Sequence, residues 1–206
     1  MQTKADGIFG EFLKQSTATV HEAMGRRGAL PSAIKPVAQA MKVCGPAFTV
    51  DSPPMDNLLL HQAIYAASPG DVLVVRVADH YEAGYWGEIM GVAAQARGLA
   101  GLVIDGGVRD SLELTAMKFP TFSHGICIRG TLKHGGGALN KPLAVGGIVI
   151  EPGDIVLGDA DGVVVVPRAE GPLILEKSIQ RVEREKTIMD QLRAGKTTME
   201  IYNLKS

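Results

Sequence analysis

Aromatic residues are scarce in this 206-residue chain, at 5%, and neither sign of charge dominates. The 21 Lys and Arg residues against 22 Asp and Glu residues leave a formal net charge of −1. Without a basic excess there is no strong electrostatic field to hold nucleic acid or an anionic membrane surface, and few aromatics leave no stacking platform for bases. We therefore expect neither a nucleic acid nor a membrane as partner.

Cysteines are few, at two, and long apolar runs are lacking. Cys44 and Cys127 are far apart and form no CxxC pair, so two free thiols in a reducing compartment are favoured, although a lone disulfide stays possible. Residues 1–7 lack the apolar core of a secretion signal, and no apolar stretch approaches the roughly 20 residues of a membrane span. We expect a cytoplasmic protein.

Several common catalytic signatures are absent. No GxGxxG follows the first predicted strand, and there is no GxxxxGK[ST] phosphate loop, no GxSxG motif and no zinc-type His/Cys spacing. His124 and His134 have no clear partners and are predicted to be surface or loop residues. No linker or low-complexity tract divides the chain, so residues 1–206 are predicted to form a single domain.

Helices and strands are predicted to alternate along the first part of the chain. Helical spacing covers 17–24, 56–67 and 87–97, and apolar runs predict strands at 44–50, 72–75 and 101–104. The run at 101–104 is typical of a strand covered on both faces, and the polar segment 105–110 follows it. Because ligands of open α/β sheets bind beyond the carboxyl ends of strands, we expect chemistry there.

The later part is predicted to be mostly β, followed by one long helix. Strands are expected at 119–131 and 143–150 and on either side of Asp161-Gly162, and a charged amphipathic helix at 169–194. An apolar stripe on this helix comprises Leu175, Ile179, Val182, Met189 and Leu192. At about 100° per residue, Glu185 projects into the stripe. This carboxylate either pairs with a neighbouring Lys or Arg, or reaches a metal or a neighbouring subunit's site.

The segment WGEIM, residues 86–90, is predicted to begin a helix. Unpaired backbone amides at a helix start can hold an anion such as a substrate carboxylate, and Gly87 would let that ligand approach closely. A Gly-Glu pair is, however, also an ordinary favourable first turn.

Arg109 and Asp110 are adjacent after a pair of glycines. Arg can grip a carboxylate or enolate oxygen through two parallel hydrogen bonds, and Asp is a hard oxygen ligand for magnesium or manganese. The ordinary alternative is a salt bridge combined with a helix N-cap, because Asp110 precedes a predicted helix at 111–117.

Two further pairs of polar residues each share one face of a predicted element. Asn57 and His61 are four residues apart on a helix, and Thr131 and Lys133 are two apart on a predicted strand. Their ordinary interpretations are a hydrogen-bonded packing histidine and an exposed strand lysine. Their functional interpretation is a substrate pocket, in which Lys133 would hold a second carboxylate.

These motifs occur in a fixed order along nearly the whole chain. They are residues 17–28 (TATVHEAMGRRG), 69–71 (PGD), 86–88 (WGE), 105–110 (DGGVRD), 130–133 (GTLK) and 153–163 (GDIVLGDADGV). The ordered set resembles the 4-hydroxy-4-methyl-2-oxoglutarate / 4-carboxy-4-hydroxy-2-oxoadipate aldolase family, which also contains the regulator of RNase E activity A. The set is far more specific than any one of its motifs.

The resemblance implies an α/β fold, a compact single domain of the swivelling β/β/α type with a long C-terminal helix. It implies a homotrimer or homohexamer with sites between subunits. It also implies a class II mechanism, in which a divalent cation, Mg²⁺ or Mn²⁺, replaces the Schiff-base lysine of other aldolases.

The resemblance also implies residue roles. Asp110 would ligate the metal, partly through waters, and Arg109 would bind the keto-acid oxygen and stabilise the enolate. The amides of Gly87, Glu88, Ile89 and Met90 would hold the pyruvate carboxylate, and the Glu88 side chain would orient a metal-bound water that acts as the base. Near the same pocket would lie Asn57, His61, Thr131 and Lys133. Glu185 matches a carboxylate that an adjacent subunit donates to the metal site.

The function that the resemblance implies is cleavage of 4-hydroxy-4-methyl-2-oxoglutarate or 4-carboxy-4-hydroxy-2-oxoadipate to pyruvate and a second 2-keto acid, as in aromatic compound catabolism. Oxaloacetate decarboxylase activity is a natural companion, because loss of carbon dioxide forms the same enolate. The alternative is a non-enzymatic protein that regulates an RNA-degrading endonuclease. Glu88, Glu185 and the pair Asn57 and His61 favour the enzyme, because an inhibitor would not need to bind metal.

Overall fold

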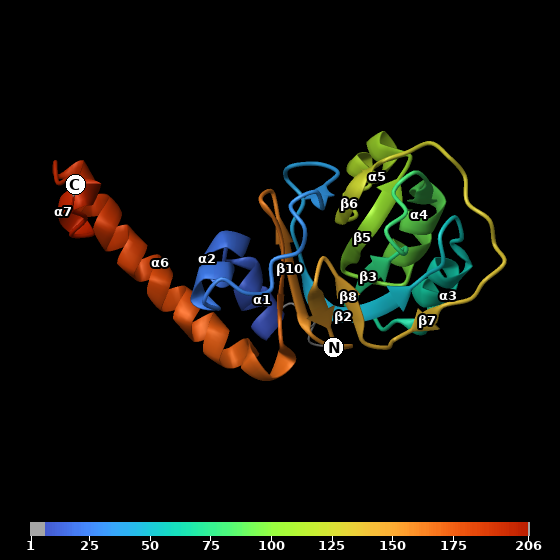
Figure 1. The fold of residues 1–206 in the computed structure, drawn as a ribbon, viewed down its shortest axis with the longest axis horizontal. Helices are drawn as coiled ribbons and strands as arrows, with labels where there is room; N and C mark the ends of the chain where they lie inside the picture. The colour runs from blue at the N-terminus through green and yellow to red at the C-terminus, as the bar shows by residue number, and fades with distance from the viewer. Residues whose placement is uncertain (1–6, 206) are drawn as a thin grey trace.

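The computed structural model describes residues 7–205, which form a curved β-sheet with helices on both sides (Figure 1). The helices are α1 (Ile8–Leu13), α2 (Thr17–Ala23), α3 (Leu58–Ala66), α4 (Glu88–Ala96), α5 (Ser111–Ala116), α6 (Gly171–Arg193) and α7 (Thr198–Ile201), with a short 3₁₀-helix at Arg168–Glu170. The strands are β1 (Lys35–Pro36), β2 (Val43–Asp51), β3 (Val72–Arg76), β4 (Gly84–Trp86), β5 (Gly101–Val108), β6 (Thr121–Ile126), β7 (Ala138–Leu139), β8 (Leu143–Val145), β9 (Ile148–Ile150), β10 (Ile155–Asp159) and β11 (Gly162–Val166).

A parallel block of strands forms the half of the sheet that carries the candidate site. The strand order is β1-β6-β5-β3-β2-β10-β11, and the pairs β2–β3, β3–β5 and β5–β6 are parallel. Helices α3, α4 and α5 connect these strands, as parallel pairing requires. Strand β4 pairs with the end of β5 in parallel, beyond the point where β3 stops. The carboxyl ends of the parallel strands therefore meet along one edge.

Three apolar clusters form the core. The largest lies between the parallel strands and α3, α4 and α5, and its biggest fully buried side chains include Trp86, Tyr85 and Phe119. A second cluster, around Phe122, fills the opposite face beside β8, β9 and β11, and a third, around Phe12, joins α1, α2 and α6 to β10 and β11. Burial of each such side chain contributes roughly 1.5–3 kcal/mol. The predicted compact mixed α/β domain with a long C-terminal helix is confirmed.

Several strand boundaries differ from the prediction. Strand β5 continues to Val108, so the segment expected beyond its end is largely part of it, whereas β6 ends at Ile126 instead of running to residue 131. The segment expected as one strand at 143–150 is the hairpin β8–β9. Its turn is Gly146-Gly147, where both φ angles are positive, at 55° and 81°. Glycine adopts this conformation without steric cost, so the pair reverses the chain.

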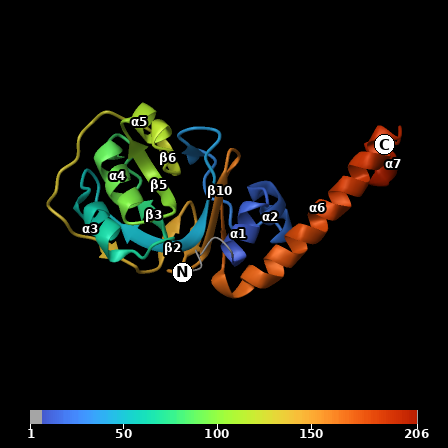
Figure 2. The same cartoon turned by 180° about the vertical axis from the view of Figure 1, so that it is seen from behind.

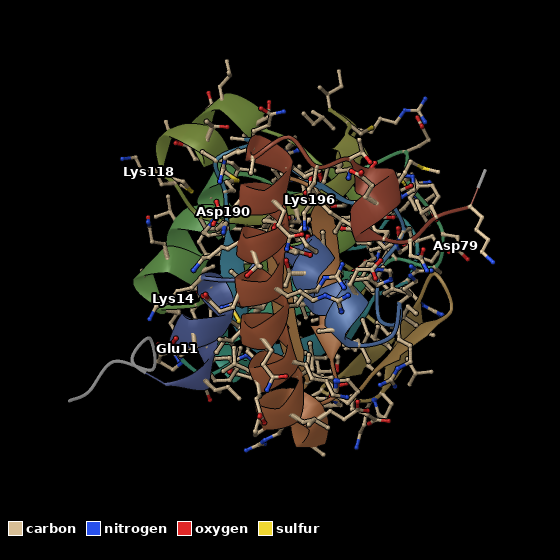
Figure 3. The ribbon with its side chains drawn as sticks, turned by 90° about the vertical axis from the view of Figure 1, so that its left-hand side faces the viewer. Glu11, Lys14, Asp79, Lys118, Asp190 and Lys196 are labelled. Atoms are coloured by element: carbon tan, nitrogen blue, oxygen red, sulfur yellow. The ribbon has the colours of Figure 1, made fainter. Side chains whose placement is uncertain are left out.

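Helix α6 extends from one side of the molecule, opposite the side that carries α3, α4 and α5 (Figures 1 and 2). Its first half packs on α2 and buries Ile174 and Ser178. Only part of the predicted apolar stripe packs against the rest of the molecule, because the side chains of Ile179 and Met189 are 42% and 43% exposed. Seen from the α6 side, the helix lies in front of the remaining elements, and the exposed side chain of Asp190 marks its outer half (Figure 3). Among residues 7–205, no helix is both long and apolar enough to cross a membrane.

Candidate active site

A cavity of about 250 Å³ lies at the carboxyl ends of the parallel strands, beside the start of α4. Its lining residues are Asn57, His61, Gly84, Tyr85, Trp86, Gly87, Ile89, Met90, Arg109, Asp110, Gly130, Thr131 and Lys133. Every predicted site residue lines it except Glu88 and Glu185. The edge where strands end and α4 begins thus brings together residues that lie more than 70 positions apart in sequence.

Asp110 follows β5 in a left-handed conformation, with φ 54° and ψ 45°, at the N-cap position of α5. Its side chain does not cap α5. Instead, the backbone N–H of Glu88, at the start of α4, donates to Asp110 Oδ2 at 3.0 Å, and Arg109 Nε lies 3.8 Å from the same oxygen. The N-cap interpretation of Asp110 is therefore wrong for its side chain, which lies between a helix N-terminus and a guanidinium.

Gly87 lies directly against this carboxylate. Its φ of −156° is extended backbone that any residue adopts, so conformational freedom does not require glycine here. A Cβ at this position would overlap Asp110 Oδ2 and lie 3.2 Å from both Asp110 Cγ and Arg109 Cγ. The close approach predicted for a substrate is therefore made, within this chain, by Asp110.

Arg109 is held by β4. Its backbone N–H donates to the Trp86 carbonyl at 2.8 Å, and a Cβ at Gly84 would lie 3.1 Å from Arg109 Cβ. The Arg109 side chain is 46% exposed, so its guanidinium can meet a ligand in the cavity. Sequence reasoning missed Gly84 and Tyr85 as cavity residues, because three residues give no periodicity from which to place β4.

Asn57 and His61 lie one turn apart at the start of α3 and both face the cavity. Asn57 is 6% exposed, its Nδ2 donates to the Tyr85 carbonyl at 2.9 Å, and its Oδ1 is buried without a hydrogen-bond partner. A buried unpaired acceptor is costly, and this oxygen is covered by the surrounding protein atoms. Burial, and the nearby positive charge of Lys133, lower the pKa of His61 below its ordinary value.

Thr131 and Lys133 both line the cavity, but they lie in irregular backbone. The prediction that they share one face of a strand is therefore wrong. Of the two histidines predicted to be surface or loop residues, His124 has partners for its ring, whereas His134 is an exposed residue of irregular backbone, as predicted. His124 Nδ1 lies 3.0 Å from Asp105 Oδ1, and its ring stacks on Tyr81 with centroids 3.7 Å apart. The backbone N–H of His134 donates to the Asp56 carboxylate. Sequence alone gave no sign of these contacts between distant segments.

The structure does not bring the side chains of Glu88 and Glu185 into the cavity. Glu88 is exposed. Glu185 lies on α6, where its Oε1 is 2.8 Å from Arg181 Nε and its side chain is 41% exposed. Within one chain, Glu185 is therefore paired with a neighbouring Arg, the first of the two alternatives for this residue. It lies on a helix that points away from the site (Figure 1). Its donation to another subunit stays a prediction.

A metal would find only part of its ligand set here. Across residues 7–205 there is no group of three or more His, Cys, Asp and Glu residues placed to hold a metal ion. Asp110 offers carboxylate oxygens, which suit Mg²⁺ or Mn²⁺, and Mg²⁺ usually keeps several waters and binds through one or two carboxylates together with substrate oxygens. The donor chemistry of Asp110 therefore fits such an ion, with the remaining ligands coming from water, substrate or another chain.

An apolar surface lies beside this site. Ile89, Leu112, Ile126 and Ile128 are 79%, 79%, 62% and 88% exposed. A second hollow of about 440 Å³ runs from Arg109 and Asp110 to three of these four residues, Leu112, Ile126 and Ile128. Exposed aliphatic side chains gathered at one place are typical of an interaction surface.

Comparison with known proteins shows the family to which the chain belongs. Residues 17–165 match the family model described as "RraA-like: Aldolase/RraA". A protein of Halalkalibacterium halodurans named "Putative 4-hydroxy-4-methyl-2-oxoglutarate aldolase" is 36% identical over 194 residues, which cover 92% of each chain. The crystal structure of an uncharacterized Pseudomonas syringae protein has a TM-score of 0.86 at 29% identity, covering 98% of this chain and 95% of that one. The structure of the RNA-processing inhibitor RraA from Thermus thermophilis has a TM-score of 0.68 at 26% identity, covering 74% of this chain and 92% of that one.

Proposed function

The chain belongs to the RraA-like aldolase and RraA family, and on that premise we propose that it is a divalent-metal-dependent pyruvate aldolase. Its substrate would be 4-hydroxy-4-methyl-2-oxoglutarate or 4-carboxy-4-hydroxy-2-oxoadipate. The observation that carries the proposal is the placement of the Asp110 carboxylate and the Arg109 guanidinium at the N-terminus of α4, in one cavity with His61 and Lys133.

The reacting end of the substrate would lie between α4 and Arg109. Asp110 would hold Mg²⁺ or Mn²⁺, which when bound supplies a Lewis acid for the 2-keto acid. The amides of Ile89 and Met90 in the first turn of α4 would bind the pyruvate carboxylate, because the Glu88 N–H already donates to Asp110. A water that the Glu88 side chain would orient as the base would accept the C4 hydroxyl proton. The C3–C4 bond then breaks, C4 becomes the carbonyl carbon of the second keto acid, and the bonding electrons become the pyruvate enolate. Arg109 would stabilise its oxygen, and protonation at C3 would release pyruvate.

The other end of the substrate would lie against α3 and the segment after Gly130. Lys133 supplies a positive charge for a second carboxylate, and His61, whose pKa is lowered, would remain a neutral hydrogen-bonding group at pH 7. Asn57 lines the same cavity beside His61. Oxaloacetate decarboxylation would use the same enolate-stabilising groups.

A homotrimer or homohexamer would complete the site. The apolar surface of Ile89, Leu112, Ile126 and Ile128 borders Asp110, and residues 7–205 of one chain hold no group of three or more His, Cys, Asp and Glu residues placed for a metal ion. These two observations support a second copy at the mouth of the cavity. Glu185 of that copy would supply the additional carboxylate.

The second candidate function is regulation of an RNA-degrading endonuclease by protein binding. The exposed apolar surface beside the site and the similarity to the RNA-processing inhibitor from Thermus thermophilis favour it. The same surface would then dock the endonuclease.

Pyruvate release from 4-hydroxy-4-methyl-2-oxoglutarate and from oxaloacetate, with Mg²⁺ and with EDTA, separates these functions. We expect metal-dependent release from the hydroxy acid. Release from oxaloacetate alone would assign a decarboxylase. A folded oligomer that turns over neither substrate would contradict the proposal and leave the regulator.

A further inference from the structure

One wall of the candidate active site is an irregular segment, residues 127–137, which we call the strap. It connects β6 to β7 and runs along the outside of α4 and α3, as the yellow trace in Figure 1. Gly135, Gly136 and Gly137 have positive φ angles of 85°, 103° and 98°. The strap is largely exposed and carries Thr131 and Lys133 into the cavity, so its position depends on a small number of anchors.

The central anchors all lie at the start of α3. The Leu132 N–H donates to the Met55 carbonyl at 2.7 Å, and the Asn57 N–H donates to the Leu132 carbonyl at 3.1 Å. Next to them, Asp56 Oδ2 accepts from the backbone N–H groups of His134 and Gly135, the latter at 3.2 Å. In the described part of the chain, these two bonds to Asp56 are the only hydrogen bonds recorded for the N–H groups of residues 133–137.

The same carboxylate also holds α3. Asp56 Oδ1 accepts from the Leu58 N–H at 2.9 Å, in the first turn of that helix. Asp56 is 4% exposed, and burial on its own would raise its pKa. The three backbone N–H groups and the nearby His134 outweigh burial and lower the pKa of Asp56 below its ordinary value. Asp56 is therefore an ionised clamp between α3 and the strap.

We infer that Asp56 is a positioning residue that sets affinity for the distal end of the substrate by fixing the strap against α3. The inference rests on the proposed function. Two walls of the cavity carry the two ends of the substrate. Gly87 lies between β4 and α4, and Arg109 and Asp110 follow β5. His61 and Lys133 lie on the two segments that Asp56 joins. Asp56 touches none of the reacting groups.

The test is Asp56→Asn, which keeps the shape of the side chain and removes its charge. An amide offers one acceptor oxygen where three N–H groups now point, so the side chain cannot accept from α3 and from the strap at once and the clamp between them is weakened. We expect KM for 4-hydroxy-4-methyl-2-oxoglutarate to rise about tenfold or more, with kcat changed much less. Deuterium exchange at C3 of pyruvate should keep its wild-type rate, because pyruvate fills only the reacting end.

A second readout does not depend on enzyme activity. Amide hydrogen exchange at His134 and Gly135 should accelerate in Asp56→Asn, while exchange within α4 stays unchanged. Asp56→Ser guards against misfolding, because serine can still cap α3 at Leu58 but is too short to reach the strap. The matched control is Asp51→Asn, whose carboxylate pairs with Arg76 at 3.0 Å and is recorded in no bond to the strap.

The outcomes are separable. Faster amide exchange in the strap with an unchanged KM would overturn the role of Asp56 in substrate affinity. An equal loss of turnover and of deuterium exchange at C3 of pyruvate would overturn it as well. Unchanged amide exchange in both variants would overturn the anchoring itself. A wild-type protein that neither cleaves the hydroxy acid nor exchanges pyruvate protons would instead refute the proposed function, and with it the inference about substrate affinity. Amide exchange would then still decide whether Asp56 anchors the strap.

Discussion

Gly87→Ala adds one methyl group at the point where the Asp110 carboxylate meets the start of α4. The backbone accepts alanine there, because φ is −156°. The new Cβ would overlap Asp110 Oδ2 and lie 3.2 Å from Asp110 Cγ. Normal contact distances then require the carboxylate to move by about 1 Å. This movement breaks its hydrogen bond with the Glu88 N–H and displaces the proposed metal ligand.

The expected loss is functional more than structural. A misplacement of about 1 Å in an active site can reduce turnover about 100-fold, which corresponds to roughly 2.7 kcal/mol of transition-state stabilisation. Exchange of a glycine N-cap for alanine costs about 1 kcal/mol of folding free energy, or a fall in Tm of roughly 2–4 °C for a chain of this size. Gly87→Ala should therefore remain folded while losing most activity.

The assay is kcat/KM for pyruvate release, with Mn²⁺ affinity by titration calorimetry and Tm on the same samples. Gly130→Ala is the matched control, because Gly130 also lines the cavity but a Cβ there meets nothing within 4 Å. We expect the control to keep wild-type activity. Wild-type kcat/KM and metal affinity in Gly87→Ala would refute the placement of Asp110 as metal ligand.

Three further predictions follow from the same geometry. Lys133→Met should raise the pKa of His61 toward its ordinary value, because it removes a positive charge that lowers it; an NMR titration of the imidazole that shows no upward shift would contradict this. Asp110→Ala and Glu185→Ala should each be inactive alone but recover part of the activity when their subunits are mixed and exchanged, and failure to recover would count against a shared site. Because folding lowers the pKa of Asp56, its stabilisation is present above about pH 4 and lost as pH falls through the lowered pKa. Acid should thus cost the wild type more unfolding free energy than Asp56→Asn, and equal losses would show that Asp56 is not the group responsible.

Periodicity located most of the helices and parallel strands, because their apolar spacing is local. The helix at 17–24 and the strand at 44–50 lie within a residue or so of α2 and β2. Spacing also placed Asn57 and His61 on one helical face, which the cavity confirms. The ordered motifs then indicated which polar residues converge, although no single motif does so.

Other features depend on contacts between distant segments and could not be found this way. Strand β5 runs to Val108 because β4 pairs with its end, and β4 is too short to show a pattern. Asp56 looks like an ordinary residue before a helix, and its bonds to residues 134 and 135 exist only once the strap has folded back. Glu185 was recognised as a misfit in its stripe, yet any role in the site needs a second chain.

The most direct test of the central claim is pyruvate release from 4-hydroxy-4-methyl-2-oxoglutarate by the wild type and by Asp110→Asn, measured side by side at saturating Mg²⁺. Asparagine keeps the size of the side chain and removes the charge that would hold the metal. The account predicts metal-dependent release by the wild type and a loss of at least about 100-fold in the folded variant. Wild-type turnover by Asp110→Asn, with the same dependence on Mg²⁺, would contradict it.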